Sequence, residues 1–103
     1  MPITTKQRSY LRSLAAREDT IIHIGKGGIT DNVITQTQDA LKARELVKGR
    51  VLENSLMTAR EAIDQLSEAC RAEQVQVIGS KFVLYKRNEQ SPKIELPKAR
   101  AKS

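Results

Sequence analysis

The stretch HIGKGGITDN, residues 23–32, concentrates the residue types that could bind phosphate. Gly25, Lys26, Gly27 and Gly28 form the pattern G-x-x-G directly before a predicted helix start. Bare glycines let a phosphate approach the main chain, and the free N–H groups and positive dipole end of a helix point to the same place. Lys26 adds a full charge. The stretch therefore predicts a phosphate-binding loop, with an ordinary glycine turn as the alternative.

The loop differs from two common nucleotide-binding patterns. No Lys-Ser or Lys-Thr pair follows the glycines at the spacing of a Walker loop. Gly25 and Gly27 match the first two glycines of the dinucleotide pattern, but Thr30 stands where a small residue must let helix and strand pack closely. A G-x-x-G loop is found in RNA-binding KH domains, where it clamps the sugar–phosphate backbone. Of these patterns, the loop matches only the last.

Residues suited to catalysis or metal binding are few. His23 is the single histidine and stands inside a predicted strand, where a packed role is more common than that of a general base. No nucleophile signature surrounds the serines or Cys70, and one cysteine with one histidine cannot complete a structural zinc site. Asp64 and Glu68 have the spacing of a solvated helix face. The sequence therefore predicts no catalytic residue, no metal site and no cofactor.

Composition limits the class of protein. The 103 residues fit one domain, and with 39% hydrophobic but only 3% aromatic residues we expect a small aliphatic core. A net charge of +6 favours a polyanionic partner, above all nucleic acid. No apolar run approaches the ~20 residues of a membrane span, and the N-terminal stretch does not resemble a secretory signal. We expect a cytoplasmic monomer with no membrane partner.

Hydrophobic periodicity predicts the elements around the glycine loop. A helix is expected over residues 5–16, and its apolar stripe consists of Tyr10, Leu11, Leu14 and Ala15. A short β-branched strand follows over residues 20–25. Thr30 is the expected N-cap of a second helix.

The second strand is expected over residues 45–54. Its alternation places Val47 and Val51 on one side and Lys48 and Arg50 on the other. Gly49 weakens the strand, or marks a bulge or a close approach of another chain segment.

The last elements are a helix and a hairpin. Thr58 and Glu61 form a capping box that opens a helix running to about residue 72, in which Cys70 is a small buried hydrophobe. Strands over residues 74–79 and 81–87 are joined by Gly79 and Ser80 in a tight turn. The domain is thus expected over residues 1–87. Residues 88–103 are expected to form a basic, mostly flexible tail, in which the stretch KIEL could add an edge contact.

The order α-β-α-β-α-β-β predicts a single α+β domain. Strands joined through a helix usually become parallel neighbours, whereas a hairpin is antiparallel. We therefore expect a mixed four-stranded sheet packed by helices.

Basic residues flank the glycine loop in the sequence. They occur in the first helix (Lys6, Arg8, Arg12), on one side of the second strand (Lys48, Arg50) and after the last strand (Lys86, Arg87). If these elements converge, the cations would form a patch that follows a phosphate backbone. The few aromatic residues, with Tyr10 and Phe82 expected in the core, predict recognition through backbone and shape rather than base stacking.

The chain resembles the YhbY family, the bacterial single-domain members of the CRM (chloroplast RNA splicing and ribosome maturation) group. The resemblance covers residues 5–87. It rests on the stretches TKQRSYLRSLA, IGKGGIT, ALKARELVK and VQVIGSKFVLYKR, and KIELP is similar to endings seen in the group. The motifs are individually short, but their order and spacing together are specific.

The resemblance implies a fold similar to the C-terminal domain of translation initiation factor three. It also implies RNA binding and association with large ribosomal subunit precursors. The RNA-contacting positions that it implies are Gly25, Lys26, Gly27, Gly28, Lys6, Arg8, Arg12, Lys48 and Arg87. The chain departs from the family at Gly49, where an aliphatic residue is usual, and we expect this glycine to cost about 0.5–1 kcal/mol relative to alanine.

The main hypothesis is a non-catalytic RNA-binding protein that assists large-subunit assembly, with ribosomal RNA or its precursor as partner and ribosomal proteins as further partners. A second hypothesis is a protein-interaction module of the translation machinery whose basic surface binds an acidic protein. A third is a small phosphate-cleaving or nucleotide-binding enzyme using His23.

Overall fold

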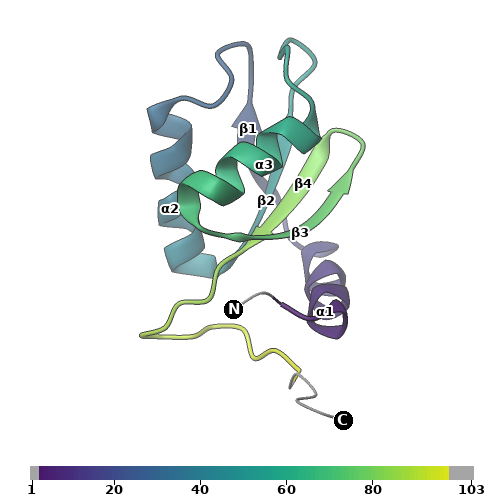
Figure 1. The fold of residues 1–103 in the computed structure, drawn as a ribbon, viewed down its shortest axis with the longest axis vertical. Coiled ribbons are helices and arrows are strands. Elements are labelled where there is room, and N and C mark those ends of the chain that lie inside the picture. Colours follow the sequence, from purple (N-terminus) through teal and green to yellow (C-terminus); the bar gives the residue numbers. More distant parts are fainter. Residues whose placement is uncertain (1–2, 98–103) are drawn as a thin grey trace.

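Three helices and four strands follow one another in residues 3–97, the part of the chain that the computed structural model describes (Figure 1). The predicted α+β class and the order α-β-α-β-α-β-β are confirmed. The elements are α1 (Thr5–Ala15), β1 (Thr20–Ile24), α2 (Asp31–Arg44), β2 (Leu46–Val51), α3 (Ala59–Cys70), β3 (Glu73–Ile78) and β4 (Lys81–Tyr85).

The sheet is mixed, as predicted, and its strand order is β1-β2-β4-β3. β1 and β2 are parallel neighbours, whereas β4 is antiparallel to both β2 and β3. The helix between β2 and β3 therefore does not make those strands neighbours, because β4 inserts between them. The run Phe82 to Tyr85 is buried throughout, on both faces of the sheet. A strand that is apolar on both faces belongs in the middle of a sheet.

Each face of the sheet carries its own core. Helices α2 and α3 cover one face, and the larger core lies beneath them, formed by Ile22, Ile24, Leu41, Val47, Val51, Ala59, Ala62, Ile63, Leu66, Cys70, Phe82 and Leu84. Helix α1 covers the other face over a smaller core formed by Ile3, Leu11, Ala15, Leu46, Val75, Val83 and Tyr85. Tyr10 was expected in this core, but it is 38% exposed. Leu11 and Ala15 alone supply the fully buried part of the helix stripe.

Gly49 is a site of close approach, and the expected cost relative to alanine is wrong. Gly49 in β2 pairs with Phe82 in β4, and the Phe82 ring lies over the glycine on the face covered by α2 and α3. A Cβ atom added at Gly49 would overlap three carbons of that ring. The space left by the missing side chain is therefore filled by Phe82, the largest residue of the larger core.

Short-range signals fix the ends of the elements. Thr58 and Glu61 form the predicted capping box of α3, and Thr30 caps α2 as expected. Gly79 has φ +58° and occupies the first position of the two-residue β3–β4 turn, which a type II′ turn favours for glycine.

The described part of the C-terminal segment, residues 88–97, runs beneath the sheet on the same side as α1. Ile94 and Leu96 pack against the smaller core. The Glu45 carboxylate is fully buried and accepts backbone N–H bonds from Asn88 at 2.6 Å, Lys93 at 2.8 Å and Ile94 at 2.7 Å. We call this arrangement the Glu45 clasp. Residues 98–103 of the expected tail lie outside the described residues.

Candidate nucleic-acid interface

The G-x-x-G stretch forms a tight turn that projects beyond the end of the sheet, next to the loop joining β2 to α3 (Figure 1). The turn is closed by the Gly28 N–H, which donates to the Gly25 carbonyl at 3.0 Å. Lys26 and Gly27, at its tip, are exposed. Among the hydrogen bonds of residues 3–97, neither of their N–H groups has a protein acceptor. The turn therefore presents two free main-chain donors beside a lysine.

The start of α2 adds part of the predicted dipole site. The Thr30 hydroxyl accepts the Val33 N–H at 3.2 Å, so one first-turn donor is already satisfied. The N–H groups of Asp31 and Asn32 have no partner among the described residues. The Asp31 carboxylate also stands in the first turn, where it favours the helix but repels an anion. The turn itself is thus the better anion-binding element.

Backbone conformation explains only one of the three glycines. Gly28 has φ +70°, a region that favours glycine. At Gly27 an added Cβ would meet only Thr30 Cγ2, at 3.7 Å, which is an ordinary contact. Neither strain nor packing therefore requires glycine at position 27, and its effect is to leave the main chain bare.

A row of basic side chains begins beside this turn. His23 pairs with Arg50, and Arg50 pairs with Lys81, across the adjacent strands β1, β2 and β4. All three residues are exposed. Because Ile22 and Ile24 point into the core under α2 and α3, the alternation of β1 places His23 on the opposite face. The row therefore lies on the sheet face that α1 leaves open.

The same face continues to α1. Lys48, Lys81 and Arg12 line one shallow hollow, together with Gln76 and Ile78. The Lys48 ammonium donates to the Ala15 carbonyl at 3.2 Å, so it also caps the C-terminal end of α1. We call the cations on this side of the sheet the basic face; they are Lys6, Arg8, Arg12, Lys48, Arg50 and Lys81.

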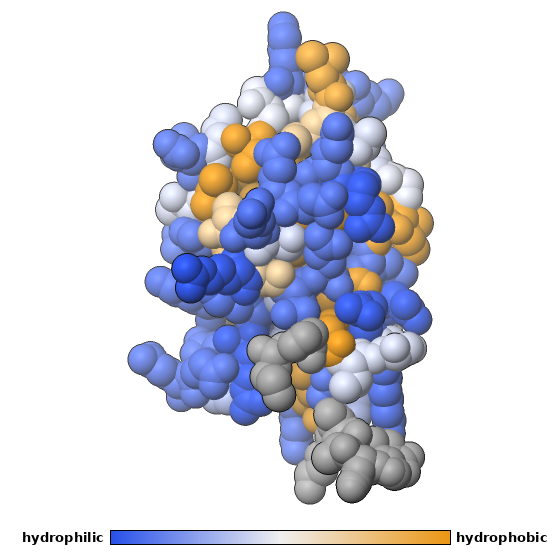
Figure 2. All heavy atoms as spheres, viewed as in Figure 1, coloured by the Kyte–Doolittle hydropathy of each residue, from blue (hydrophilic) through white to orange (hydrophobic). Residues whose placement is uncertain are grey.

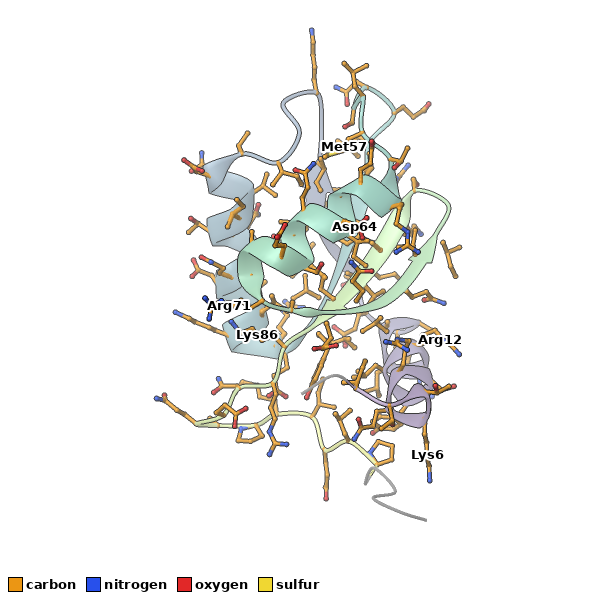
Figure 3. All side chains as sticks on the ribbon, viewed as in Figure 1. Lys6, Arg12, Met57, Asp64, Arg71 and Lys86 are labelled. Atoms are coloured by element: carbon orange, nitrogen blue, oxygen red, sulfur yellow. The ribbon has the colours of Figure 1, made fainter. Side chains whose placement is uncertain are left out.

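Arg87 is not part of this face. It follows β4 at the end of the sheet opposite the glycine turn and lines a hollow with Leu41, Lys42 and Cys70. Lys6 also lies far from the turn, at the lower end of α1 in Figure 3, whereas Arg12 lies nearer the sheet. The structure thus brings Arg12, Lys48 and Lys81 together in one hollow, whereas the turn lies beyond the far end of β1 and Arg87 lies at the opposite end of the sheet from the turn.

Lys86 and Cys70, which line the hollow at Arg87, have structural roles. The Lys86 ammonium donates to the Cys70 carbonyl at 2.9 Å and so caps α3. Burial raises the pKa of the Cys70 thiol above its ordinary value, and Lys86 partly offsets this. Burial, with Glu45 nearby, likewise raises the pKa of Tyr85. Both groups are therefore neutral near pH 7, which suits a buried position.

The elements that carry the basic face are poor in acidic residues. The elements α1, β1, β2 and β4 contain no aspartate or glutamate. The helices on the other face carry Asp31, Asp39, Glu61, Asp64 and Glu68. Figure 2 shows the side with α3 in front, where hydrophobic residues form separate patches rather than one continuous area. The basic face should therefore attract a polyanion more strongly than α2 and α3, where five carboxylates stand with the three cations Lys42, Arg44 and Arg60.

Sequence reasoning missed two members of the row as site residues. Arg50 belongs to the basic patch expected from the sequence but not to the predicted RNA-contacting positions, and Lys81 belongs to neither. Their signal is the strand order: Lys81 aligns with Arg50 only once β4 is known to pair with β2. From the sequence, His23 is expected to be a packed residue rather than a general base, whereas in the structure it is exposed and stands between the turn and two cations.

Residues 3–97 contain no group of three or more His, Cys, Asp or Glu side chains arranged to hold a metal ion. Within the same range, every helix is too short or too polar to cross a bilayer.

Comparison with known proteins gives one consistent answer. Residues 3–86 match the CRS1 / YhbY (CRM) domain. The chain is 42% identical over 95 residues to the "Probable RNA-binding protein YqeI" of Bacillus subtilis, covering 92% of this chain and 99% of the relative. It is 33% identical to an "RNA-binding protein" of Haemophilus influenzae, covering 93% and 96% of the two chains.

A solved structure agrees with the fold. The solution structure of protein SAV1595 from Staphylococcus aureus superposes with a TM-score of 0.77 at 50% sequence identity, covering 92% of this chain and 99% of that one. The similarity to these proteins in sequence and fold extends over nearly the whole chain. The chain belongs to the CRS1/YhbY family of CRM domains.

Proposed function

We propose that this protein binds structured RNA through the glycine turn and the basic face, without catalysis. The observation that carries the proposal is that a bare turn with free N–H groups stands at the end of the row formed by His23, Arg50 and Lys81 on three adjacent strands that contain no carboxylate. The names of the relatives from Bacillus subtilis and Haemophilus influenzae support RNA as the polyanion.

The geometry suits contacts to the sugar–phosphate backbone. Neighbouring strands lie about 4.8 Å apart, so the row from His23 through Arg50 to Lys81 spans roughly 10 Å. Phosphates along such a row would be neutralised by Arg50 and Lys81, while the turn donates main-chain hydrogen bonds to one more. Aromatic stacking has little part, because Phe82 and Tyr85 are buried. Recognition is therefore expected to depend on RNA shape and charge.

We further propose that the RNA is that of the large ribosomal subunit or its precursor, with ribosomal proteins nearby. The support is the family resemblance in the glycine turn and the first helix. Crosslinking the protein to RNA in cells and mapping the crosslinked nucleotides tests this part. Crosslinks spread over unrelated transcripts, with no enrichment in large-subunit RNA, would contradict it.

Substitutions in the turn test the binding site. Gly27→Asp combined with Lys26→Ala should weaken binding of a structured hairpin RNA by at least about tenfold, because it places a carboxylate where a phosphate is expected and removes a cation. The fold should survive, since position 27 accepts a side chain without strain or overlap. Fluorescence polarisation with a labelled hairpin gives the affinity, and circular dichroism checks the fold.

Lys42→Ala is the control for the lost cation; it changes the net charge by one, whereas the turn variant changes it by two. Lys42 is exposed on α2, away from the turn, and its loss removes one charge from the whole molecule. It should change the affinity by less than about twofold. If the turn variant also stays within twofold of the parent chain, the glycine turn is not the RNA-binding site.

A further inference from the structure

Three arginines from two helices flank one edge of the sheet. β3 is the last strand in the order β1-β2-β4-β3, and a groove along it is lined by Arg8 and Arg12 from α1 and Arg60 from α3. Figure 3 shows Arg12 and Asp64 on opposite sides of β3, which places α1 and α3 on either side of this edge. Only Arg8 and Arg12 belong to the basic face.

The outer edge of β3 has unpaired main-chain groups. Arg8 Nε donates to the Gln74 carbonyl at 3.3 Å, so the main-chain acceptor at the start of the edge already has a partner. From Gln76 to Ile78, β3 pairs only with β4 among the described residues. Because Ile78 and Lys81 flank a two-residue turn, they form a hydrogen-bonded pair, and the N–H and C=O groups of Val77 face away from β4. Such an edge is able to accept another strand.

The arginines keep free donors beside this edge. Arg60 is held by the Gln74 side-chain oxygen at 3.1 Å and lies 3.8 Å from Asp64, yet its side chain is 63% exposed. Asp64 is already shared, since the Gln74 amide also donates to it at 2.8 Å. Arg12 is exposed, and its one hydrogen bond within the described residues goes to the Ser9 hydroxyl at 3.3 Å. A guanidinium carries five N–H donors, so both sides of the edge remain available to carboxylates.

We propose that the β3 edge binds an extended acidic segment of a partner protein by strand addition. Side chains of an added strand alternate between the two faces of the sheet. Carboxylates on the α1 face of the added strand would meet Arg12 and Arg8. Carboxylates on the α3 face would meet Arg60. Ile78, 61% exposed at the end of the edge, offers an apolar contact. An RNA strand has no repeating main-chain N–H and C=O groups to pair with the edge.

A synthetic peptide tests the proposal directly. The probe is a fluorescein-labelled ten-residue peptide of alternating glutamate and threonine, with blocked ends, titrated with the full chain in low salt. We expect saturable binding, and amide shifts in nuclear magnetic resonance spectra centred on Gln76 to Ile78. Arg60→Gln and Arg12→Gln should each weaken binding by about fivefold, as expected for one partly exposed charge pair. Arg17→Gln, an exposed arginine outside the groove, should change it by less than about twofold.

Two control peptides separate strand addition from simple charge attraction. One carries a methyl group on every second backbone nitrogen, and the other has lysine in place of glutamate. Both should fail to bind. The proposal is overturned if the methylated peptide binds as well as the parent peptide, or if the amides of Gln76 to Ile78 do not shift. It is also overturned if Arg60→Gln weakens hairpin RNA binding and leaves peptide binding unchanged. The glycine-turn variant should bind the peptide normally, so failure of the RNA proposal can be distinguished from failure of this one.

Discussion

At the scale of single residues, Gly49 shows how packing reverses an expectation drawn from propensity. A glycine in a strand interior is normally destabilising relative to alanine. Here the Phe82 ring fills the space that a Cβ would need, and Phe82 itself is 1% exposed. The aromatic ring thus covers the glycine across two paired strands, a device also used in designed sheets.

Gly49→Ala should lower the free energy of unfolding by about 1–3 kcal/mol, the usual cost of overpacking a core. Urea denaturation measures it. Gly27→Ala is the matched control, because its Cβ meets only Thr30 and its φ is not positive; it should leave stability unchanged or slightly raised. In the Gly49→Ala background, Phe82→Leu should destabilise less than it does alone, because the smaller side chain relieves the overlap. A Gly49→Ala protein as stable as the parent chain would contradict the packing argument.

Glu45 is the second residue whose role is set by distant parts of the chain. Its φ of +65° is unusual for a residue with a side chain, and three amides compensate by binding its carboxylate. Glu45→Ala should lower the free energy of unfolding by about 3 kcal/mol or more, since bonds to a charged acceptor are stronger than neutral ones.

Glu45→Gln should cost less than the alanine substitution. One oxygen can still accept from Lys93 and Ile94, while the new amide group faces the Asn88 N–H and loses that bond. Chemical denaturation of both variants provides the comparison. Equal losses for the two would show that the carboxylate hydrogen bonds do not hold the segment.

At the scale of elements, local signals predicted what local interactions decide. The Thr58–Glu61 capping box and the Gly79–Ser80 turn depend on residues a few positions apart, so the sequence is enough to find them. Long-range pairing is a different matter. The insertion of β4 between β2 and β3 follows from burial on both faces, and the alignment of Arg50 with Lys81 follows from that insertion. The glycine turn was found, but the row of cations beside it needed the strand order.

The C-terminal segment gives the prediction at this scale. A chain ending at residue 87, the boundary expected from the sequence, should fold with its free energy of unfolding lowered by about 3–5 kcal/mol relative to one ending at residue 97. The loss combines the Glu45 clasp with the apolar contacts of Ile94 and Leu96. Thermal unfolding of the two chains measures the difference. Equal midpoints would place residues 88–97 outside the stable domain.

At the scale of the whole molecule, the separation of charge between the two sides of the sheet is the dominant feature. The elements α1, β1, β2 and β4 carry cations and no carboxylate, whereas α2 and α3 carry five carboxylates and three cations. A net charge of +6 therefore understates the field that a polyanion meets on the basic face.

RNA affinity should fall steeply with salt concentration, because each neutralised phosphate releases counterions. Arg50→Ala and Lys81→Ala should each reduce the slope of log affinity against log salt by about one phosphate contact, while Lys42→Ala should leave the slope unchanged. Titrations at four or more salt concentrations supply the slopes. Identical slopes for all variants would remove the strand row from the RNA interface.

The Glu45 clasp also has a consequence for biosynthesis. The amides that bind the Glu45 carboxylate lie up to 49 positions later in the chain. At about 5–20 residues per second, a ribosome needs roughly 2–10 s to make them after Glu45 itself. During that interval the Glu45 carboxylate lacks the amides that bind it, and the smaller core lacks the contacts of Ile94 and Leu96. The Glu45 clasp, and with it the full stability of the domain, can form only after the segment around Ile94 has left the exit tunnel.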